Sequence, residues 1–326
     1  MTTSPLLPIH PVAGVDYPRT FGEFDRWFAS EIACREYLLK LRWRDGFRCP
    51  RCGSATQPWT TARRQLHCPD CQNQTSVTAG TLFEGTRKLL RLWFLAMWFV
   101  TSQKHGASAL GLQRVLGLGS YQTAWVWLHK LRRAMVRSAR ELLISPVEVD
   151  ETYVGAPEQD VHGREALDKS IVVIAAEDRG ARIGRIRIQV VSDCSGDSLL
   201  PFIANNVEPG STVRTDGWRG YSGLPAMGFR HKIVRLRTKS RPAHELLPHV
   251  HRVASLLKRW LMGTHQGGVH PHQLDYYLDE FTFRFNRRTS RSRGLLFYRL
   301  MEQVLQTGPA PYKAVVGGRQ DAYHNI

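Results

Sequence analysis

Four cysteines arranged as two close pairs form the most specific chemical pattern in this sequence. Cys49 and Cys52 are separated by two residues, Cys68 and Cys71 are separated in the same way, and fifteen residues lie between the pairs. Such turns let thiolates converge on one tetrahedral ion, and the intervening length suits a β-hairpin that brings both turns together. The pattern predicts a zinc ribbon whose Zn²⁺ is structural, because a four-thiolate shell leaves no position for substrate. The alternative is a set of four buried thiols or a redox pair.

A carboxylate and an imidazole further along the chain occupy positions that suit a cation site. Residues 211–221 (STVRTDGWRGY) predict a brief strand that ends at Asp216 beside a glycine, where a carboxylate can hold a cation at a sheet edge. Residues 250–263 (VHRVASLLKRWLMG) predict an amphipathic helix. His251 lies off its apolar stripe, and Lys258 follows two turns later, about 10 Å away on nearly the same face. We therefore expect His251, as a metal ligand or base, and Lys258, as a phosphate-binding cation, to lie along one face of this helix.

The charge balance indicates a polyanionic partner. Lys and Arg total 45 against 28 acidic residues, a formal charge of +17, and residues 86–140 contain ten Lys or Arg and no acid. Such a one-sided distribution is typical of phosphate contact in nucleic-acid binding. Because 42% of the residues are hydrophobic, the chain is expected to fold and is not merely basic and disordered.

The acid-free region contains the pattern of a helix-turn-helix. Residues 108–116 and a segment beginning near 121 predict two helices around a glycine-containing turn at 117–120. On the second helix, apolar residues at helical spacing should face the core, which leaves Gln122, Thr123, His129 and Lys130 nearer solvent. A plain helical hairpin with solvated charges is the alternative.

Membrane and export roles are not expected. The N-terminus lacks a basic segment followed by an apolar core, and the most apolar run, 89–100, contains Arg91 and is too short to span a bilayer. It predicts a buried helix. The number and clustering of the cysteines favour a reducing cytoplasm, with Cys34 and Cys194 as ordinary small apolar residues.

A change from helical to strand-like pattern after residue 145 predicts a second domain. Residues 146–155 (PVEVDETYVG), 170–178 and 183–193 predict three consecutive strands, and 196–205 an amphipathic helix. On the first strand Glu148 shares a face with Asp150, whereas Glu151 points the opposite way.

The order of these motifs closely resembles the bacterial insertion-sequence transposases of the DDE superfamily, in the branch that has an N-terminal zinc ribbon. The resemblance extends from about Asp25 to Leu300 and includes VEVDETYVG, VRTDGWRGY, VHRVASLLKRWLMGTHQG and YLDEFTFRFNRR. It implies a multi-domain α/β protein with a ribonuclease-H-like mixed-sheet core. The expected parts are an N-terminal arm and helix (1–44), the ribbon (45–80), the helix-turn-helix region (81–145), the catalytic core (146–306) and a tail (307–326).

The resemblance also implies the active site. Asp150 becomes the first catalytic acid and Asp216 the second, and the third position, usually Glu, falls on His251, with Lys258 seven residues later. Mg²⁺ or Mn²⁺ ions would be held by these three side chains, although Mg²⁺ prefers oxygen to imidazole. Asp150 would bridge two ions for phosphodiester transfer, while His251 would bind the second ion or act as a base. The spare carboxylates are Glu148 and then Glu280.

DNA contacts are expected from the basic residues around this site and from the second helix of the helix-turn-helix. The expected DNA-binding residues are Lys258, Arg287, Arg288, Lys130 and Gln122. Two further basic runs, 230–241 and 283–294, would clamp phosphates, or else form solvated faces. In 276–288, aromatic residues at helical spacing favour core packing over base stacking.

The predicted function is that of a cytoplasmic, nucleoid-associated transposase. It would bind the terminal inverted repeats of its insertion sequence as a homo-oligomer, cleave DNA strands and join them to target DNA. One rival is a DNA-binding regulator with a catalytically dead core, and another is a generic nuclease of the same fold.

Overall fold

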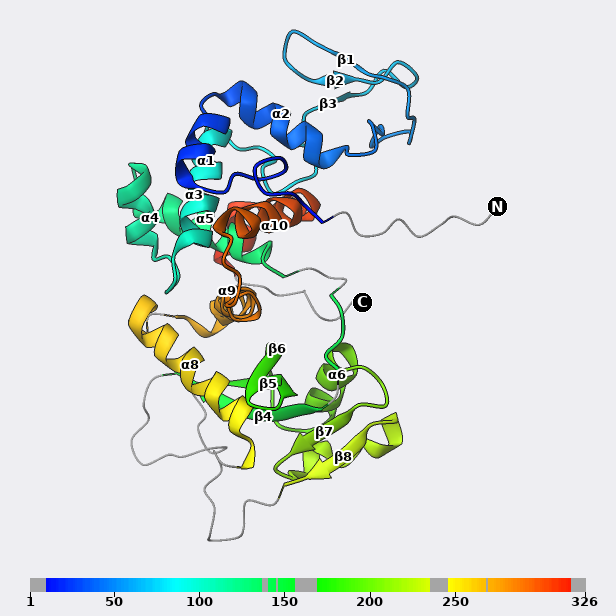
Figure 1. Ribbon diagram of the computed structural model, residues 1–326, viewed down its shortest axis with the longest axis vertical. Coiled ribbons are helices and arrows are strands. Elements are labelled where there is room, and N and C mark those ends of the chain that lie inside the picture. The colour runs from blue at the N-terminus through cyan, green and yellow to red at the C-terminus, as the bar shows by residue number, and fades with distance from the viewer. Residues whose placement is uncertain are drawn as a thin grey trace. The chain divides into compact units, whose positions relative to one another are not determined.

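The computed structural model describes residues 10–136, 140–144, 146–155, 169–234, 246–267 and 269–317, which fall into two compact units (Figure 1). The first unit comprises the chain up to Met135 together with Ser290–Val315. The second comprises Val136–Thr289 and the residues from Val316 onward.

The first unit opens with two helices and a small sheet. Helices α1 (Phe21–Trp27) and α2 (Glu31–Arg42) each begin at a hydroxyl side chain, because Thr20 and Ser30 accept hydrogen bonds from first-turn N–H groups. Strands β1 (Trp59–Thr60), β2 (Leu66–His67) and β3 (Gln74–Thr75) then form an antiparallel sheet in the order β1-β2-β3. The hairpin expected between the cysteine pairs is thus present.

Three helices follow the small sheet. They are α3 (Leu90–Ser102), α4 (Ala109–Leu116) and α5 (Tyr121–Arg133). The apolar run is the buried helix α3, as expected, and α4 ends at Gly117, whose φ of +61° suits glycine. Ser120 caps α5 by accepting a hydrogen bond from the Thr123 N–H. The expected pair of helices and the turn between them are therefore both present.

One expected orientation on α5 is wrong. His129 was expected near solvent, but its side chain is fully buried and packs beside Trp125, with ring centroids 4.1 Å apart. The buried stripe on α5 is wider than periodicity alone indicates, because Val126 and Arg132 are also buried.

The C-terminal helix α10 (Arg293–Gln306) completes the core of this first unit, and α11 (Tyr312–Val316) follows it. The fully buried ring of Phe297 lies 5.4 Å from that of Phe24 and 5.9 Å from that of Phe94, measured between centroids. The expected catalytic core, 146–306, included this helix. The structure differs, because α10 packs on α2 and α3 and belongs with the N-terminal half of the chain.

The second unit is built on a mixed sheet. Its strands are β4 (Val147–Val154), β5 (Ser170–Arg179), β6 (Arg182–Val191), β7 (Thr212–Thr215) and β8 (Arg230–Ile233), in the order β6-β5-β4-β7-β8. Strands β4, β5 and β6 are antiparallel neighbours, whereas β4, β7 and β8 run parallel. The sheet therefore joins a meander to two parallel crossovers.

Helices cover both faces of this sheet (Figure 1). Helices α8 (Pro248–His265) and α9 (Leu274–Asn286) pack on the face that carries Val172 and Ile174, and α6 (Gly196–Asn206) packs on the face of Val173 and Ala175. The aromatic residues of α9 lie in this core, as expected. The short 3₁₀ helices are η2 (Arg219–Tyr221), η3 (Pro225–Met227) and η4 (Pro271–Gln273).

The described residues include no helix with both the length and the apolar character needed to cross a bilayer.

Replacing Phe297 with alanine should destabilise the first unit by about 3–5 kcal/mol, the range typical of a buried Phe→Ala change. Phe21→Ala is the matched control, because that ring is 55% exposed in the same aromatic cluster and its loss should cost about 1 kcal/mol or less. Hydrogen exchange of the α3 amides under increasing urea measures both. Equal effects of the two variants would show that α10 is not part of this core.

Candidate functional site

The four cysteines of the ribbon form a compact ligand set. Their sulfur atoms all lie within 4.8 Å of one another, with Sγ–Sγ distances of 3.6 Å for Cys49–Cys71 and 3.7 Å for Cys52–Cys68. Four converging thiol groups at these distances fit one tetrahedral Zn²⁺, which would take all four as thiolates. The predicted structural zinc site is therefore supported by geometry.

The two turns that carry these cysteines have the same backbone geometry. The Cys49 N–H donates to Ser54 O, and Cys49 O accepts from the Gly53 N–H. In the second turn, the Cys68 N–H donates to Asn73 O, and Cys68 O accepts from the Gln72 N–H. The residue in the left-handed region is Gly53 (φ +74°) in one turn and Gln72 (φ +58°) in the other. Repetition of one turn on both sides of the hairpin explains why both pairs point at one centre.

The two candidate acids lie at the same end of neighbouring parallel strands. Val147 of β4 is in register with Val213 of β7, and Asp150 and Asp216 each lie three residues beyond that pair. Adjacent strands are about 5 Å apart, so the two carboxylates start from neighbouring backbone positions. Asp150 Oδ1 accepts from the Glu151 N–H at 3.0 Å, and Asp216 Oδ1 accepts from the Trp218 N–H at 2.8 Å.

A buried tyrosine lies close to the acids at this end of the sheet. The hydroxyl of Tyr221 donates to Glu151 Oε2 at 2.6 Å. Burial raises the pKa of Tyr221 well above its usual value, and the charges of Glu151, Asp150 and Asp216 raise it further. The tyrosine therefore stays protonated and holds Glu151 on the α6 face of the sheet, away from α8.

Helix α8 brings the third candidate residue to the first. His251 Nε2 lies 3.7 Å from Asp150 Oδ2, and the two side chains are 31% and 19% exposed. The structure thus places His251 beside Asp150, and Asp216 on the next strand. Within the described part of the chain, the sets whose ligand atoms all lie within 4.8 Å of one another are the four cysteines and Glu148–Asp178–His249; the three predicted residues are not such a set.

Glu148 anchors the beginning of α8 on the sheet. Its side chain is fully buried, and Oε2 accepts from the N–H groups of His249 and Val250 at 2.8 and 3.2 Å. These are first-turn donors that have no partner inside the helix, so a carboxylate from β4 performs the work of an N-terminal cap. Burial raises the pKa of Glu148, while these hydrogen bonds and the neighbouring positive charges oppose the rise.

An arginine and a histidine complete this anchor. Arg214 Nη1 lies 2.9 Å from Asp178 Oδ2 and 3.5 Å from Glu148 Oε1, and His249 Nε2 lies 3.0 Å from Asp178 Oδ1. Burial alone would raise the pKa of Asp178, but the contacts with His249 and Arg214 lower it overall. Because a guanidinium lies against both carboxylates and offsets part of their charge, the geometry favours a structural link between β4, β5, β7 and α8 over a metal site.

The sequence analysis identified only part of this anchor. Glu148 was a spare catalytic carboxylate, and the structure gives it the capping role instead. Arg214 and Asp178 were missed, although Arg214 alternates with buried residues on a predicted strand and Asp178 ends another. The other spare acid, Glu280, is 1% exposed and pairs with Arg284 on α9 at 2.7 Å.

The expected DNA-binding residues of the second unit differ in their surroundings. Lys258 is exposed on α8, and its pKa is lowered first by partial burial and then by Lys169, a neighbouring cation that the sequence analysis missed. Arg288 donates to Phe285 O and Gly184 O at 2.8 and 3.3 Å and also to Ile183 O. Arg287 stacks on Phe283 at 4.1 Å. Lys258 is thus the best placed to contact phosphate.

The expected DNA-binding residues of the first unit are on α5. Gln122 is exposed and donates to the Tyr312 hydroxyl, while Lys130 is half-buried, which lowers its pKa. Their DNA contacts remain predictions. In the basic run 230–241, residues 235–241 lie outside the described residues.

Comparisons with known proteins agree with this architecture. Residues 143–286 match the family model described as an ISXO2-like transposase domain, and residues 29–74 match a transposase zinc-ribbon domain. The chain therefore belongs to the zinc-ribbon insertion-sequence transposases of the DDE type. The transposase domain contains Asp150, Asp216 and His251, as well as the whole Glu148 anchor.

Two relatives support the assignment to this transposase family. An uncharacterized protein in transposable element ISH50 of Halobacterium salinarum is 29% identical over 278 residues, covering 79% of this chain and 91% of the relative. An uncharacterized transposase-like protein of Haemophilus influenzae is 28% identical over 116 residues, covering 36% of this chain and 93% of the relative. No solved structure matches this transposase.

Cys68→Ser should release zinc from the transposase ribbon, because three thiolates hold the ion less well than four and the small sheet depends on it. Inductively coupled plasma mass spectrometry of purified protein should find about one Zn²⁺ per chain in the wild type. Cys34→Ala is the control: burial raises the pKa of this thiol to about 12, and it lies outside the ligand set. A Cys68→Ser protein that retains full zinc would refute the four-cysteine site.

Glu148→Gln should loosen the first turn of α8, because it removes the negative charge that attracts both the first-turn N–H groups and Arg214. Hydrogen exchange of the His249 and Val250 amides should become about tenfold or more faster, as expected for the loss of one charged hydrogen bond. Glu280→Gln is the control, since it removes a buried, arginine-paired carboxylate from α9, which packs on the same face of the sheet as α8. Unchanged exchange at α8 in Glu148→Gln would eliminate the capping role.

Proposed function

We propose that this transposase binds the terminal inverted repeats of its own insertion sequence and performs divalent-metal-dependent cleavage and transfer of DNA strands. The observation that carries the proposal is the approach of His251 Nε2 on α8 to within 3.7 Å of Asp150 Oδ2 on β4, with Asp216 just beyond the end of the neighbouring parallel strand β7. The mixed sheet with helices on both faces supports a ribonuclease-H-like core, the kind of scaffold in which such acids are expected.

The donor set fits divalent ions. Two carboxylates on neighbouring strands offer the oxygen ligands that Mg²⁺ and Mn²⁺ prefer, and His251 Nε2 adds a nitrogen 3.7 Å from Asp150. Bound there, a pair of ions would activate the attacking oxygen and stabilise the leaving oxygen of a phosphodiester. Imidazole suits Mn²⁺ better than Mg²⁺, so this donor set is expected to favour manganese.

The side chains around these ligands have separate tasks. His251 is close enough to Asp150 to be held by it and to accept a proton from a water molecule or a 3′-hydroxyl at the site. Lys258 on α8 and the neighbouring Lys169, which precedes β5, supply positive charge that would hold the phosphates that flank the cleaved bond. The Tyr221 hydroxyl donates a hydrogen bond to Glu151 and holds this side chain on the α6 face of the sheet, so Glu151 does not compete with Asp150 for a cation.

Recognition of the element ends is assigned to the first unit. Its helices α4 and α5 have helix-turn-helix spacing, and Arg114 and Gln122 are exposed on them. The acid-free stretch 86–140 gives this region a uniformly positive charge, which favours DNA association at low salt. Transposition joins two ends, so we propose that the active form is a homo-oligomer on DNA, acting in the cytoplasm at the nucleoid.

Asp150→Asn and Asp216→Asn should abolish nicking of a labelled terminal-repeat duplex in Mn²⁺ while leaving DNA binding within about twofold, because amides keep the shape but lose the charge that holds cations. Nicking and joining are followed on sequencing gels. Glu208→Gln is the control, as an exposed acid of the same unit with no role in the site.

His251 gives this experiment a second arm. His251→Glu should increase the ratio of Mg²⁺-supported to Mn²⁺-supported nicking, and His251→Ala should reduce nicking with both ions. Binding without nicking by the wild type would identify a DNA-binding regulator. Cleavage without joining and without preference for the repeats would identify a generic nuclease.

A further inference from the structure

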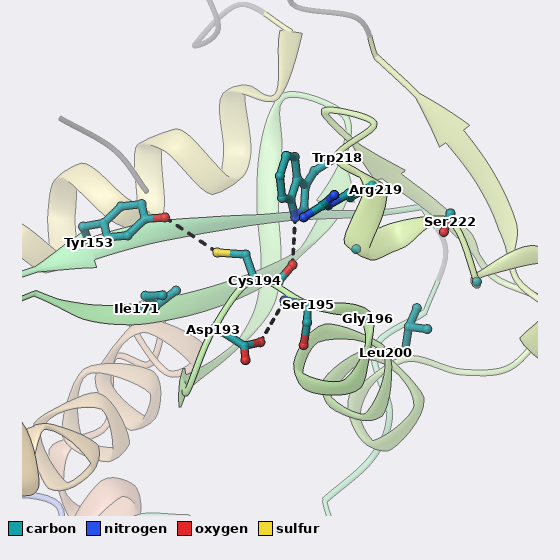
Figure 2. Close-up of a pocket in the computed structure, with 12 residues that line it drawn as sticks. Tyr153, Ile171, Asp193, Cys194, Ser195, Gly196, Leu200, Trp218, Arg219 and Ser222 are labelled. Carbon is teal, nitrogen blue, oxygen red and sulfur yellow. Dashed lines mark hydrogen bonds between the residues drawn. The ribbon is translucent and has the colours of Figure 1, made fainter. Parts of the chain in front are cut away.

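A pocket opens on the α6 side of the sheet, where the loop after β7 meets the start of α6 (Figure 2). Its volume is about 810 Å³, large enough for a small organic ligand or a nucleotide. The lining comes from the ends of β4 and β5, the start of α6, and the loop after β7. Tyr153, Cys194, Trp218 and Arg219 are the side chains most relevant to binding.

The loop after β7 links the pocket to the proposed active site, although the pocket lies on the α6 face of the sheet and His251 lies on the α8 face. Trp218 donates its backbone N–H to Asp216 Oδ1 at 2.8 Å, so the residue that supplies the pocket wall also orients the second acid. Tyr153 lies three residues after Asp150 on the same strand. A DNA strand held at the two acids would therefore run next to the loop that forms this pocket wall.

The indole of Trp218 is held in a fixed orientation. Its Nε1–H donates to Cys194 O at 2.7 Å, which Figure 2 shows as a dashed line. Gly220 allows this close approach, because a Cβ there would lie 2.5 Å from Cys194 O and 3.1 Å from the indole Cδ1. A half-buried ring that is locked on one edge can present a rigid flat surface at little entropic cost.

The charges around the ring suit a nucleotide. The Arg219 guanidinium is exposed and lies 5.3 Å from the centre of the Trp218 ring, where it can reach a phosphate. Asp193 lies on the other side and is held by hydrogen bonds from Ser195 and Ser198 at 2.8 Å. A phosphate is thus favoured near Arg219 and disfavoured near Asp193, which leaves the remaining apolar and aromatic wall for a base.

We propose that this pocket binds one unpaired nucleotide at the end of the transposon DNA, with its base stacked on Trp218 and its phosphate at Arg219. The inference rests on the proposed function, because it takes DNA as the substrate held at Asp150 and Asp216. Capture of a base outside the duplex would fix the position of the adjacent phosphodiester relative to the two acids. Aromatic rings serve this purpose for every base, since each has a flat face.

The experiment compares Trp218→Leu and wild-type protein on terminal-repeat duplexes in Ca²⁺, with one abasic nucleotide placed at each of the last positions in turn. On the intact duplex, Trp218→Leu should bind roughly 5- to 150-fold more weakly, the range that corresponds to loss of one stacked base. On the duplex that lacks the captured base, both proteins should bind equally, because that DNA offers Trp218 nothing to stack on. Fluorescence anisotropy measures each affinity.

Three variants make the result specific to stacking. Trp218→Phe should keep most of the affinity, because it retains an aromatic face. Arg219→Ala should weaken binding to intact and abasic DNA alike, since it removes a phosphate contact. Met227→Ala, 40% exposed on η3 outside the pocket, should change neither.

The outcomes separate this inference from the proposed function. If Trp218→Leu binds intact DNA as tightly as wild type, or loses the same affinity on every abasic duplex, Trp218 does not stack on a base. If either result is found while the wild-type protein binds and nicks terminal repeats, the proposed base binding in the pocket is overturned and the proposed function stands. Wild-type protein that binds no terminal-repeat DNA would overturn both.

Discussion

The arrangement of the candidate site depends on one buried carboxylate, that of Glu148. It accepts both first-turn N–H groups of α8 at 2.8 and 3.2 Å, and it lies two residues before Asp150 on the same face of β4. A helix held at its first turn carries His251 at a fixed height above the sheet, which places Nε2 3.7 Å from Asp150. Burial of a charge is costly, so the contacts of Glu148 with helix N–H groups and Arg214 are needed to retain it.

The acidic residues at this end of the sheet therefore fall into two classes. Glu148 and Asp178 share the guanidinium of Arg214, and Glu151 accepts the hydroxyl proton of Tyr221, so each is used within the protein. Asp150 and Asp216 each accept a hydrogen bond from a neighbouring backbone N–H group, and His251 Nε2 lies 3.7 Å from Asp150. The chain carries a formal charge of +17, yet this part of the sheet carries several acids, where cations would be needed to meet phosphate.

Local patterns predicted the elements well, and contacts between distant segments poorly. The four cysteines, the strand motifs and the helix that carries His251 each depend on residue type at short spacing, and each was located from the sequence. The anchor joins residues 148, 178, 214 and 249, whose proximity depends on strand order and register. The placement of α10 was missed for the same reason, since its amphipathic pattern does not specify which unit its apolar face covers.

The contacts made by residues 216–220 could also not be predicted from the sequence. Asp216, Trp218 and Arg219 follow β7 in one short turn, and the motif alone suggested only a strand-end acid. In the structure the same turn orients the carboxylate through the Trp218 N–H and turns the indole toward Cys194, and Gly220 permits the close approach to Cys194. A single loop thus couples the position of a candidate metal ligand to the shape of the adjoining pocket. If DNA binds in that pocket as proposed, its effect on Trp218 would reach Asp216 through one hydrogen bond, so the loop would link the proposed base capture to the proposed strand cleavage.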